Sequence, residues 1–277
     1  VRGPDTYVAG YDSNAPKYQV TVDVRPGFPV YVNDAPYGFG PQKLSFIVGT
    51  VNNVSVPTHV LVGIGVRIHI PSNSVTFSSP TKVAFQEHFE YLLTVKTSGL
   101  PAHLGSTKVY VAGTATIDDY GVSTINDACK DGYRKWFDNN SATGTINIDT
   151  PPGGLLFVSW ILDQNTIGST RPLSALTMNK PHLAIANYAP PPDFSLSFSP
   201  SSRTIIQYGT DTFLVGTNSM FAFNVPISLT LSGLPSDAKY EFNPKSIVPP
   251  HTATLTITAG KTTGKFVLTI TGESRGL

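Results

Sequence analysis

Histidine and carboxylate side chains are the residues of this chain that could do acid–base or metal chemistry. The six histidines are scattered one to a strand or turn, and the densest group of titratable residues is His88 with Glu87 and Glu90. We interpret that group as a solvent-exposed face of a strand or linker. His59 and His69 flank an apolar run that we expect to be one strand, which would place them roughly 33 Å apart if it is straight. At that distance the two histidines cannot bind the same metal ion.

Catalytic motifs are missing from the sequence. It contains no glycine-rich phosphate loop, no His-Glu-x-x-His, no Gly-x-Ser-x-Gly and no Asp-Thr/Ser-Gly pair. We therefore expect a protein that is not an enzyme, with no catalytic residues and no cofactor.

Residues 127–138 partly imitate the loop of a calcium-binding EF-hand. Asp127, Asp131 and Asp138 occupy positions one, five and twelve, and a glycine occupies position six. Position three is a cysteine, position twelve is shorter than the usual glutamate, and two lysines bring opposing charge. The three aspartates are candidate ligands of a calcium ion, with Asp118 and Asp119 as further oxygen donors. The alternative is an exposed loop that its aromatic residues anchor to the domain.

Two Asn-X-Ser sequons are candidate glycosylation sites. Asn53-Val-Ser55 and Asn139-Asn-Ser141 both lie in polar, turn-like stretches. We expect glycans at Asn53 and Asn139 if the cell has the machinery, and unmodified loop asparagines if it does not.

Aromatic residues are frequent near the N-terminus, and flat rings can stack on sugar rings. They are predicted either to line a carbohydrate-binding face or to fill the core and decorate strands. The residues concerned are Tyr7, Tyr11, Tyr18, Phe28, Tyr31, Tyr37 and Phe39.

Composition excludes several classes of protein. Lys and Arg number 19 against 18 for Asp and Glu, so a net charge of +1 offers no basic surface for nucleic acid. Cys129 is the only cysteine, which excludes an intrachain disulfide and a zinc site made of cysteines. The sequence has no run of 18 or more apolar residues, so it predicts no membrane-spanning helix.

Alternating apolar and polar residues predict strands along the whole chain. Phe194, Leu196 and Phe198 alternate with serines, which is the period of a strand with one buried face. Residues 60–66 are apolar on both faces and predict a core strand, whereas residues 127–140 are least β-like and predict a short helix or long loop. The expected fold is all-β, a tandem array of immunoglobulin-like antiparallel β-sandwich domains.

A proline-rich segment indicates where one domain ends and the next begins. Ala189-Pro-Pro-Pro192 cannot continue a strand ladder and is typical of a stiff spacer. We predict an N-terminal domain over residues 1–84, a second domain over 85–188 and a C-terminal domain over 193–277.

The C-terminal third resembles an immunoglobulin-like module of secreted bacterial and archaeal proteins. The match follows the pattern DFSLSxSPSS, ISLTLSGLPS, FxPxSxxPP, TLTIT and FxLTITG, and covers residues 193–202, 227–236, 242–250, 252–258 and 264–272 in that order. The resemblance implies an extracellular location on the cell surface and a role as a spacer, stalk or adhesion unit. The whole chain is similar to the stalk subunits of archaeal surface layers (S-layers) and to extracellular filament subunits.

The sequence hypothesis is therefore a structural cell-surface protein whose partners are copies of itself or another surface-layer protein. In the filament version, or pilus, residues 1–17 would donate a strand to the sandwich of the next subunit. The alternative is a non-catalytic accessory or carbohydrate-binding region of a secreted archaeal hydrolase, with glycans as partners.

Overall fold

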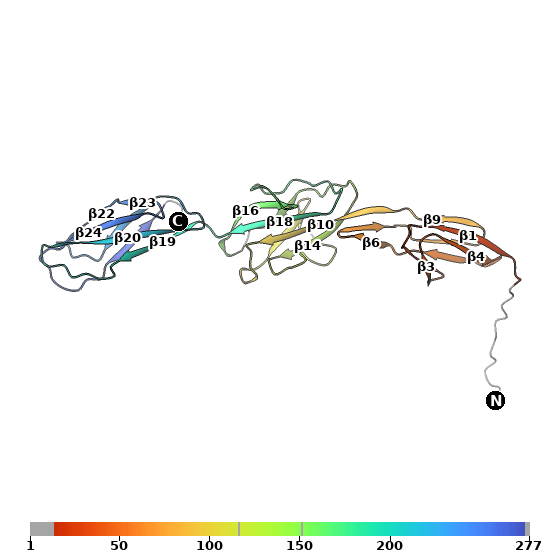
Figure 1. Cartoon of the computed structure of the whole chain (residues 1–277), viewed down its shortest axis with the longest axis horizontal. Helices are drawn as coiled ribbons and strands as arrows, with labels where there is room; N and C mark the ends of the chain where they lie inside the picture. The colour runs from red at the N-terminus through yellow and green to blue at the C-terminus, as the bar shows by residue number, and fades with distance from the viewer. Residues whose placement is uncertain (1–13, 116, 151, 275–277) are drawn as a thin grey trace, which may run out of the picture. The chain divides into compact units, whose positions relative to one another are not determined.

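The protein is all-β, as the sequence predicts (Figure 1). The computed structural model describes residues 14–115, 117–150 and 152–274. In these ranges the only helical elements are the 3₁₀ turns η1 (Ala102–Leu104) and η2 (Pro152–Gly154). Accordingly, none of the described residues belongs to a helix long and apolar enough to cross a membrane.

The N-terminal segment is a sandwich of two small sheets. One sheet has the order β4-β1-β9 and the other β3-β2-β5-β8. Val20 and Val22 of β1 alternate with exposed residues and pack against Val54 of the facing sheet in one buried cluster. The strands of this segment are β1 (Lys17–Asp23), β2 (Pro29–Val32), β3 (Ala35–Phe39), β4 (Gln42–Ile47), β5 (Asn52–Ser55), β6 (His59–Gly63), β7 (Val66–His69), β8 (Ser74–Phe77) and β9 (Thr81–Ala84).

The middle segment is built on one large sheet with the order β17-β16-β18-β10-β7-β6, and β14 also pairs with β10. A smaller sheet has the order β12-β11-β13, with β15 on β11. The strands of this segment are β10 (His88–Ser98), β11 (Thr107–Val111), β12 (Thr114–Ala115), β13 (Thr124–Ile125), β14 (Tyr133–Asp138), β15 (Ile146–Ile148), β16 (Leu156–Leu162), β17 (Asn165–Gly168) and β18 (His182–Ala189).

Strand β10 joins the N-terminal and middle segments through backbone hydrogen bonding. Its first half pairs with β7 from His88↔His69 to Tyr91↔Val66, and its second half pairs with β18 from Leu93↔His182 onward. Between these two ladders the Leu92 N–H donates to the Gly65 carbonyl at 2.9 Å. One edge of β10 is thus hydrogen-bonded without interruption across both segments.

The first and last strands of both segments are parallel neighbours. β1 opens the N-terminal segment and β9 closes it, and the two pair from Val20↔Thr81 to Asp23↔Ala84. β10 opens the middle segment, and its parallel partner β18 closes it. The chain therefore enters and leaves each segment through two strands that are hydrogen-bonded to each other and point the same way.

The C-terminal segment is a second sandwich. Its sheets have the orders β19-β20-β24-β22 and β23-β21-β25, and they enclose a buried cluster that includes Val215, Leu229 and Leu255. Its immunoglobulin-like identity stays a prediction. The strands are β19 (Asp193–Ser199), β20 (Thr210–Met220), β21 (Ile227–Ser232), β22 (Lys239–Asn243), β23 (Ser246–Ile247), β24 (Thr252–Thr258) and β25 (Thr269–Glu273).

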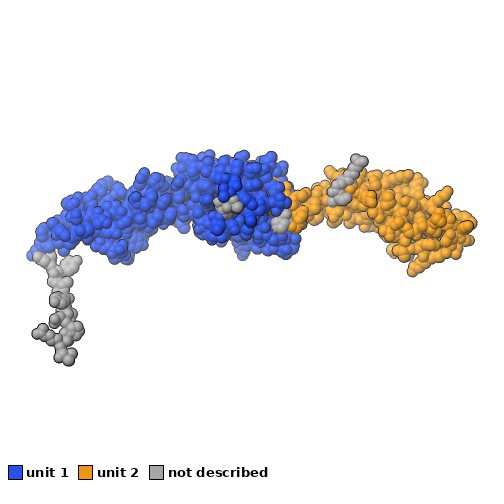
Figure 2. Space-filling model, turned by 180° about the vertical axis from the view of Figure 1, so that it is seen from behind, with its two compact units in different colours: residues 1–150, 158–187 blue, residues 151–157, 188–277 orange. Residues whose placement is uncertain are grey.

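Contacts divide the chain into two compact units, coloured separately in Figure 2. The first comprises residues 1–150 and 158–187, and the second comprises 151–157 and 188–277. The first unit contains the N-terminal segment and most of the middle segment, which share the ladder along β10. The division of the chain into three independent domains stays a prediction.

Residues 59–70 form a hairpin, which corrects the expectation of one long core strand. β6 and β7 pair antiparallel with a bulge between Leu61 and Gly63, and Gly65 has a φ of +67° in the reversal. Leu61 and Ile64 are 72% and 100% exposed instead of buried. Glycine at position 65 permits this turn, since a Cβ there would lie 2.9 Å from the Pro181 side chain.

The expected helix or loop over residues 127–140 is only partly present, since residues 127–132 form turns without regular structure. Residues 133–138 form β14, which pairs with β10 from Val95↔Tyr133 to Glu90↔Asp138. Tyr133 and Trp136 are buried although this strand also carries Arg134 and Lys135. The ladder to β10 is a long-range pairing that overrides the weak local strand signal.

The N-terminal aromatic residues have different surroundings. Tyr18 and Phe28 are in the core, whereas Tyr37 and Phe39 on β3 are 56% and 68% exposed. The proposed donor segment lies mostly outside the described residues, which begin at 14.

Asp163 ties the turn between β16 and β17 to the start of β18. Its carboxylate accepts hydrogen bonds from the Leu183 N–H at 3.0 Å and contacts His182 Nδ1 at 2.8 Å and Lys180 Nζ at 3.0 Å. Burial acts to raise the pKa of Asp163, but the bonds from Leu183, Lys180 and His182 outweigh it and hold the pKa below its usual value.

The turn at Gly65 yields a prediction about stability. We expect Gly65→Ala to destabilise the protein by about 1–3 kcal/mol more than Gly113→Ala, because the new methyl group meets Pro181. Gly113 is the matched control, since its φ of +77° carries a similar backbone cost and a Cβ there would meet nothing within 4 Å. Urea unfolding of both variants measures the difference, and equal losses would contradict the close approach to Pro181.

A second prediction concerns the pH dependence of the Asp163 contacts. A lowered pKa means that the carboxylate adds stability above its unfolded-state pKa and loses it as the pH falls through the folded-state pKa. We expect Asp163→Asn to lower the urea midpoint at about pH 7 and to have a smaller effect at about pH 3, because the contribution of the carboxylate declines once the pH falls below the unfolded-state pKa of about 3.9. A midpoint difference that is the same at both pH values would refute this role of the charge.

Candidate functional site

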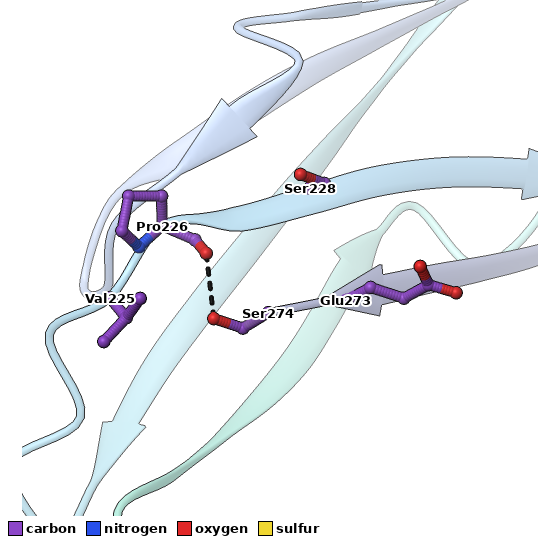
Figure 3. A pocket seen from close by; sticks show the side chains of 5 residues that line it. All are labelled: Val225, Pro226, Ser228, Glu273 and Ser274. Atoms are coloured by element: carbon purple, nitrogen blue, oxygen red, sulfur yellow. Dashed lines mark hydrogen bonds between the residues drawn. The ribbon is translucent and has the colours of Figure 1, made fainter. Parts of the chain in front are cut away.

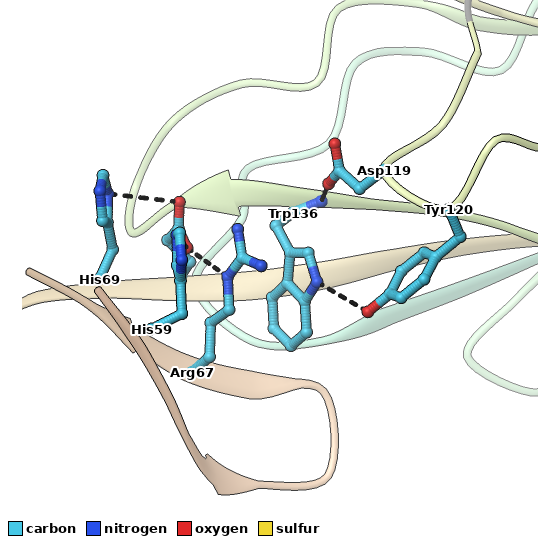
Figure 4. A network of polar contacts seen from close by, with 7 residues as sticks. His59, Arg67, His69, Asp119, Tyr120 and Trp136 are labelled. Atoms are coloured by element: carbon cyan, nitrogen blue, oxygen red, sulfur yellow. Dashed lines mark hydrogen bonds and ion pairs between the residues drawn. The ribbon is translucent and has the colours of Figure 1, made fainter. Parts of the chain in front are cut away.

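The candidate site is a polar network where the β6–β7 hairpin meets β10 and β14 (Figure 4). Its members are His59, Arg67 and His69 from the hairpin, Glu90 from β10, Trp136 from β14, and Asp119 and Tyr120 from the preceding loop. We call this set the junction network. It contains the group of three potential metal ligands that converge within the described residues, namely His59, His69 and Glu90.

The register of the hairpin brings the histidines together. His59 and His69 are equally far from Ile64 in the reversal, and they are direct cross-strand partners. Directly opposed residues of an antiparallel pair project from the same face of the sheet. The two imidazole rings accordingly stack with their centroids 4.6 Å apart and an interplanar angle of 15°.

Glu90 is the buried acid of the junction network, with a side chain only 11% exposed. Its cross-strand partner on β7 is Arg67, whose Nε donates to Glu90 Oε2 at 2.5 Å. Glu90 Oε2 also lies 3.8 Å from His59 Nε2, and Oε1 lies 3.8 Å from His69 Nδ1. A buried carboxylate needs such charged or hydrogen-bonded partners, because removing it from water is costly.

Arg67 extends the network onto the aromatic residues of the middle segment. Its guanidinium lies over the Trp136 ring at 4.5 Å, a cation–π geometry. The Trp136 indole N–H donates to the Tyr120 hydroxyl at 3.1 Å, and the Arg134 guanidinium lies 3.9 Å from the centre of the Tyr120 ring. Two cation–π contacts and the hydrogen bond between the two aromatic residues therefore connect the hairpin to β14 and to the loop before it.

Two aspartates fix that loop by accepting backbone hydrogen bonds. Asp118 accepts from the N–H groups of Tyr120, Val122 and Arg134 at 2.6 to 2.8 Å, and Asp119 Oδ2 accepts from the Trp136 N–H at 2.7 Å. Both carboxylates are thus occupied by the protein backbone instead of converging with the three aspartates of the predicted calcium loop.

The electrostatic surroundings favour a neutral His59. Burial, the nearby Arg67 cation and the neighbouring His69 lower the pKa of His59, and the Glu90 carboxylate opposes them only in part. A neutral imidazole keeps a lone pair for a metal ion or a hydrogen-bond donor.

The structure separates the acidic group expected around His88. Glu87 accepts two hydrogen bonds from Arg25, at 3.1 and 2.9 Å, whereas Glu90 pairs with Arg67. His88 is exposed, and its strand position is opposite His69. The expectation that His59 and His69 are too far apart to share an ion is wrong, since they belong to the two arms of a hairpin.

The candidate calcium ligands do not converge. Asp127 accepts a hydrogen bond from the Thr97 hydroxyl at 2.7 Å, and Asp131 lies 3.9 Å from Arg134. Asp138 is the last residue of β14, so that strand lies between it and the other two aspartates. The group of converging potential ligands in the described part of the chain does not include them.

The two sequons lie in different surroundings. Asn139 is exposed in the turn after β14. Asn53 is part of β5, and its side-chain oxygen accepts a hydrogen bond from the Ser74 hydroxyl at 2.7 Å. Asn139 is therefore more accessible to a modifying enzyme than Asn53, and both remain predicted glycosylation sites.

A hollow in the C-terminal segment lies between the start of β21 and the end of β25 (Figure 3). It measures about 420 Å³ and is lined by Val225, Pro226, Ser228, Glu273 and Ser274. The Ser274 hydroxyl donates to the Pro226 carbonyl at 2.9 Å, and Glu273 is the single titratable side chain in the lining. One isolated carboxylate does not form a nucleophile–base pair.

The junction network escaped sequence analysis because its members come from distant parts of the chain. A usable signal was present in Gly63-Ile64-Gly65, since two glycines around one residue can form a hairpin reversal. A hairpin centred there places residues 59 and 69 opposite each other. The position of Glu90 beside them had no local signal.

The burial of the Arg67–Glu90 pair leads to a prediction that has a matched control. We expect Arg67→Met to destabilise the protein by about 3 kcal/mol, because the buried Glu90 carboxylate then lacks its close charged partner. Arg25→Met removes a similar pair with Glu87, in which the arginine is 45% exposed, and should cost at most about 1 kcal/mol. Chemical unfolding of both variants at neutral pH measures the two losses. A loss for Arg67→Met no larger than for Arg25→Met would contradict the described environment of Glu90.

Comparisons with known proteins assign neither a family nor a function to this site. No protein-family model matches the chain, and no curated protein matches it.

Proposed function

We propose that this chain is a structural protein of the cell surface that bears tension, as a surface-layer stalk or lattice component or a filament subunit. Its partners in this proposal are further copies of itself or another surface-layer protein. The proposal assigns mechanical strength, and not a reaction, to the β-segments.

The observation that supports the proposal is the parallel pairing of entry and exit strands. Tension along the chain would pull β1 by its first residue and β9 by its last, in opposite directions along the same axis. Because the two strands are parallel neighbours, this load shears all hydrogen bonds between Val20↔Thr81 and Asp23↔Ala84 together. Hydrogen bonds loaded together resist more force than bonds that open one after another.

The middle segment repeats this arrangement over a longer ladder. β10 and β18 are parallel from Leu93↔His182 to Ser98↔Asn187, and they are again the first and last strands of their segment. The pairing of β10 with β7 joins the two ladders within the first unit. Both segments of the first unit therefore present the same shear geometry to a load along the chain, which suits a stalk or a filament.

Single-molecule force spectroscopy tests the proposal on the full chain. Handles are attached through Lys17→Cys and Ala84→Cys in a Cys129→Ser background, so that tension shears β1 against β9. The matched control uses Asp23→Cys with Ala84→Cys, because Asp23 and Ala84 are register partners at the same end of the two strands. All three handle positions are exposed.

We expect the shear geometry to unfold at several times the force of the control geometry, in which the ladder opens one pair at a time. Forced unfolding reports the barrier to unfolding, which is the property a load-bearing protein needs. Equal unfolding forces in the two geometries would contradict a tension-bearing role for this strand pair.

A further inference from the structure

Three side chains with the ligand chemistry of a transition-metal site converge in the junction network. His59, His69 and Glu90 each offer one ligand atom, and these atoms lie within 4.8 Å of one another. Two imidazole nitrogens and one carboxylate oxygen are a ligand set that binds zinc and leaves a fourth position for water.

The backbones of the three residues are already held by neighbouring strands. β6, β7 and β10 are adjacent in one sheet, with His59 opposite His69 and Glu90 opposite Arg67. Ligand atoms of a tetrahedral zinc site lie about 3.3 Å apart, given Zn–N bonds of about 2.0–2.1 Å. Rotations of the imidazole rings and of the Glu90 carboxylate can close the remaining distance, since these terminal torsions are soft.

Arg67 orients the carboxylate as an outer partner. Its Nε donates to Glu90 Oε2, while Oε1 lies on the side of His69 Nδ1. Carboxylates that bind metal ions are commonly held by such a hydrogen bond, which fixes their direction. The Arg67 guanidinium itself rests on the Trp136 ring, so it is positioned by packing as well as by charge.

Access from solvent suits metal binding. The side chains of His59 and His69 are 41% and 30% exposed, whereas Glu90 is 11% exposed beneath them. An ion can therefore reach the imidazoles from solvent and meet the carboxylate below.

We propose that His59, His69 and Glu90 form a binding site for a divalent transition-metal ion of the zinc class. Nitrogen ligands select zinc, nickel or copper over calcium, which prefers sites made of oxygen. A bound ion would cross-link the β6–β7 hairpin to β10 and stiffen the junction of the two segments. This site does not depend on the proposed load-bearing function, and each can fail without the other.

Calorimetric titration of the full chain with zinc chloride tests the proposal. We expect one zinc ion per chain, and a dissociation constant raised at least about tenfold by His59→Gln or His69→Gln. The matched control is His103→Gln, since His103 is exposed in η1 and lies outside the cluster. Absence of zinc binding, or binding that His69→Gln leaves unchanged, would overturn the proposal.

Thermal unfolding separates loss of the site from loss of the fold. In the presence of EDTA we expect the wild type and His69→Gln to unfold at similar temperatures, because His69 Nδ1 lies 3.8 Å from Glu90, beyond hydrogen-bond distance, and Arg67 remains as the close partner of this carboxylate. Zinc should raise the unfolding temperature of the wild type and of His103→Gln but not that of His69→Gln, while calcium should raise none of them. A zinc-induced rise that is equal in His69→Gln and the wild type would count against the site.

Discussion

The hydrogen bonding of β10 is the constraint on which the first compact unit depends. A strand has two edges, and β10 uses one of them for β14 and the other for β7 followed by β18. The two ladders on that second edge leave Leu92 between them, and its N–H is satisfied by the Gly65 carbonyl. The reversal of the β6–β7 hairpin thus completes the hydrogen bonding of a strand in the next segment. Detaching the hairpin would expose part of an edge and leave these polar groups without partners.

The junction network adds specificity to that backbone pairing. A buried ion pair contributes little net stability compared with apolar packing, but leaving one charge unpaired is strongly unfavourable. Any register of the hairpin that moves Arg67 away from Glu90 is therefore unfavourable, because it leaves the buried carboxylate unpaired. The packing of Arg67 on Trp136 links the same register to β14, whose backbone is in turn bonded to Asp119. Correct docking of the hairpin and correct placement of the loop before β14 support each other.

Strands with one buried face could be predicted from the sequence, and strands defined by distant partners could not. The serine–apolar alternation of residues 194–198 correctly predicted the strand β19. The apolar run after His59 was misleading, because Leu61, Val62 and Ile64 are exposed on a hairpin and not buried between sheets. β14 was missed since its arginine and lysine oppose local strand signals and its pairing with β10 is long-range. The convergence of His59, His69 and Glu90 depends on the hairpin and on its long-range pairing with β10, and the position of Glu90 had no local signature.

The central claim is that residues 88–98 are one ordered strand shared by two segments, with no flexible linker between them. Hydrogen–deuterium exchange of the native protein, resolved to peptides across residues 86–98, tests it most directly. The account predicts that the amides of residues 89–92 exchange as slowly as those of residues 93–97, in a common opening event, because both halves are held by ladders along the same edge. Fast exchange of residues 89–92 beside a protected second half would show that the hairpin does not dock on β10 and would contradict the account.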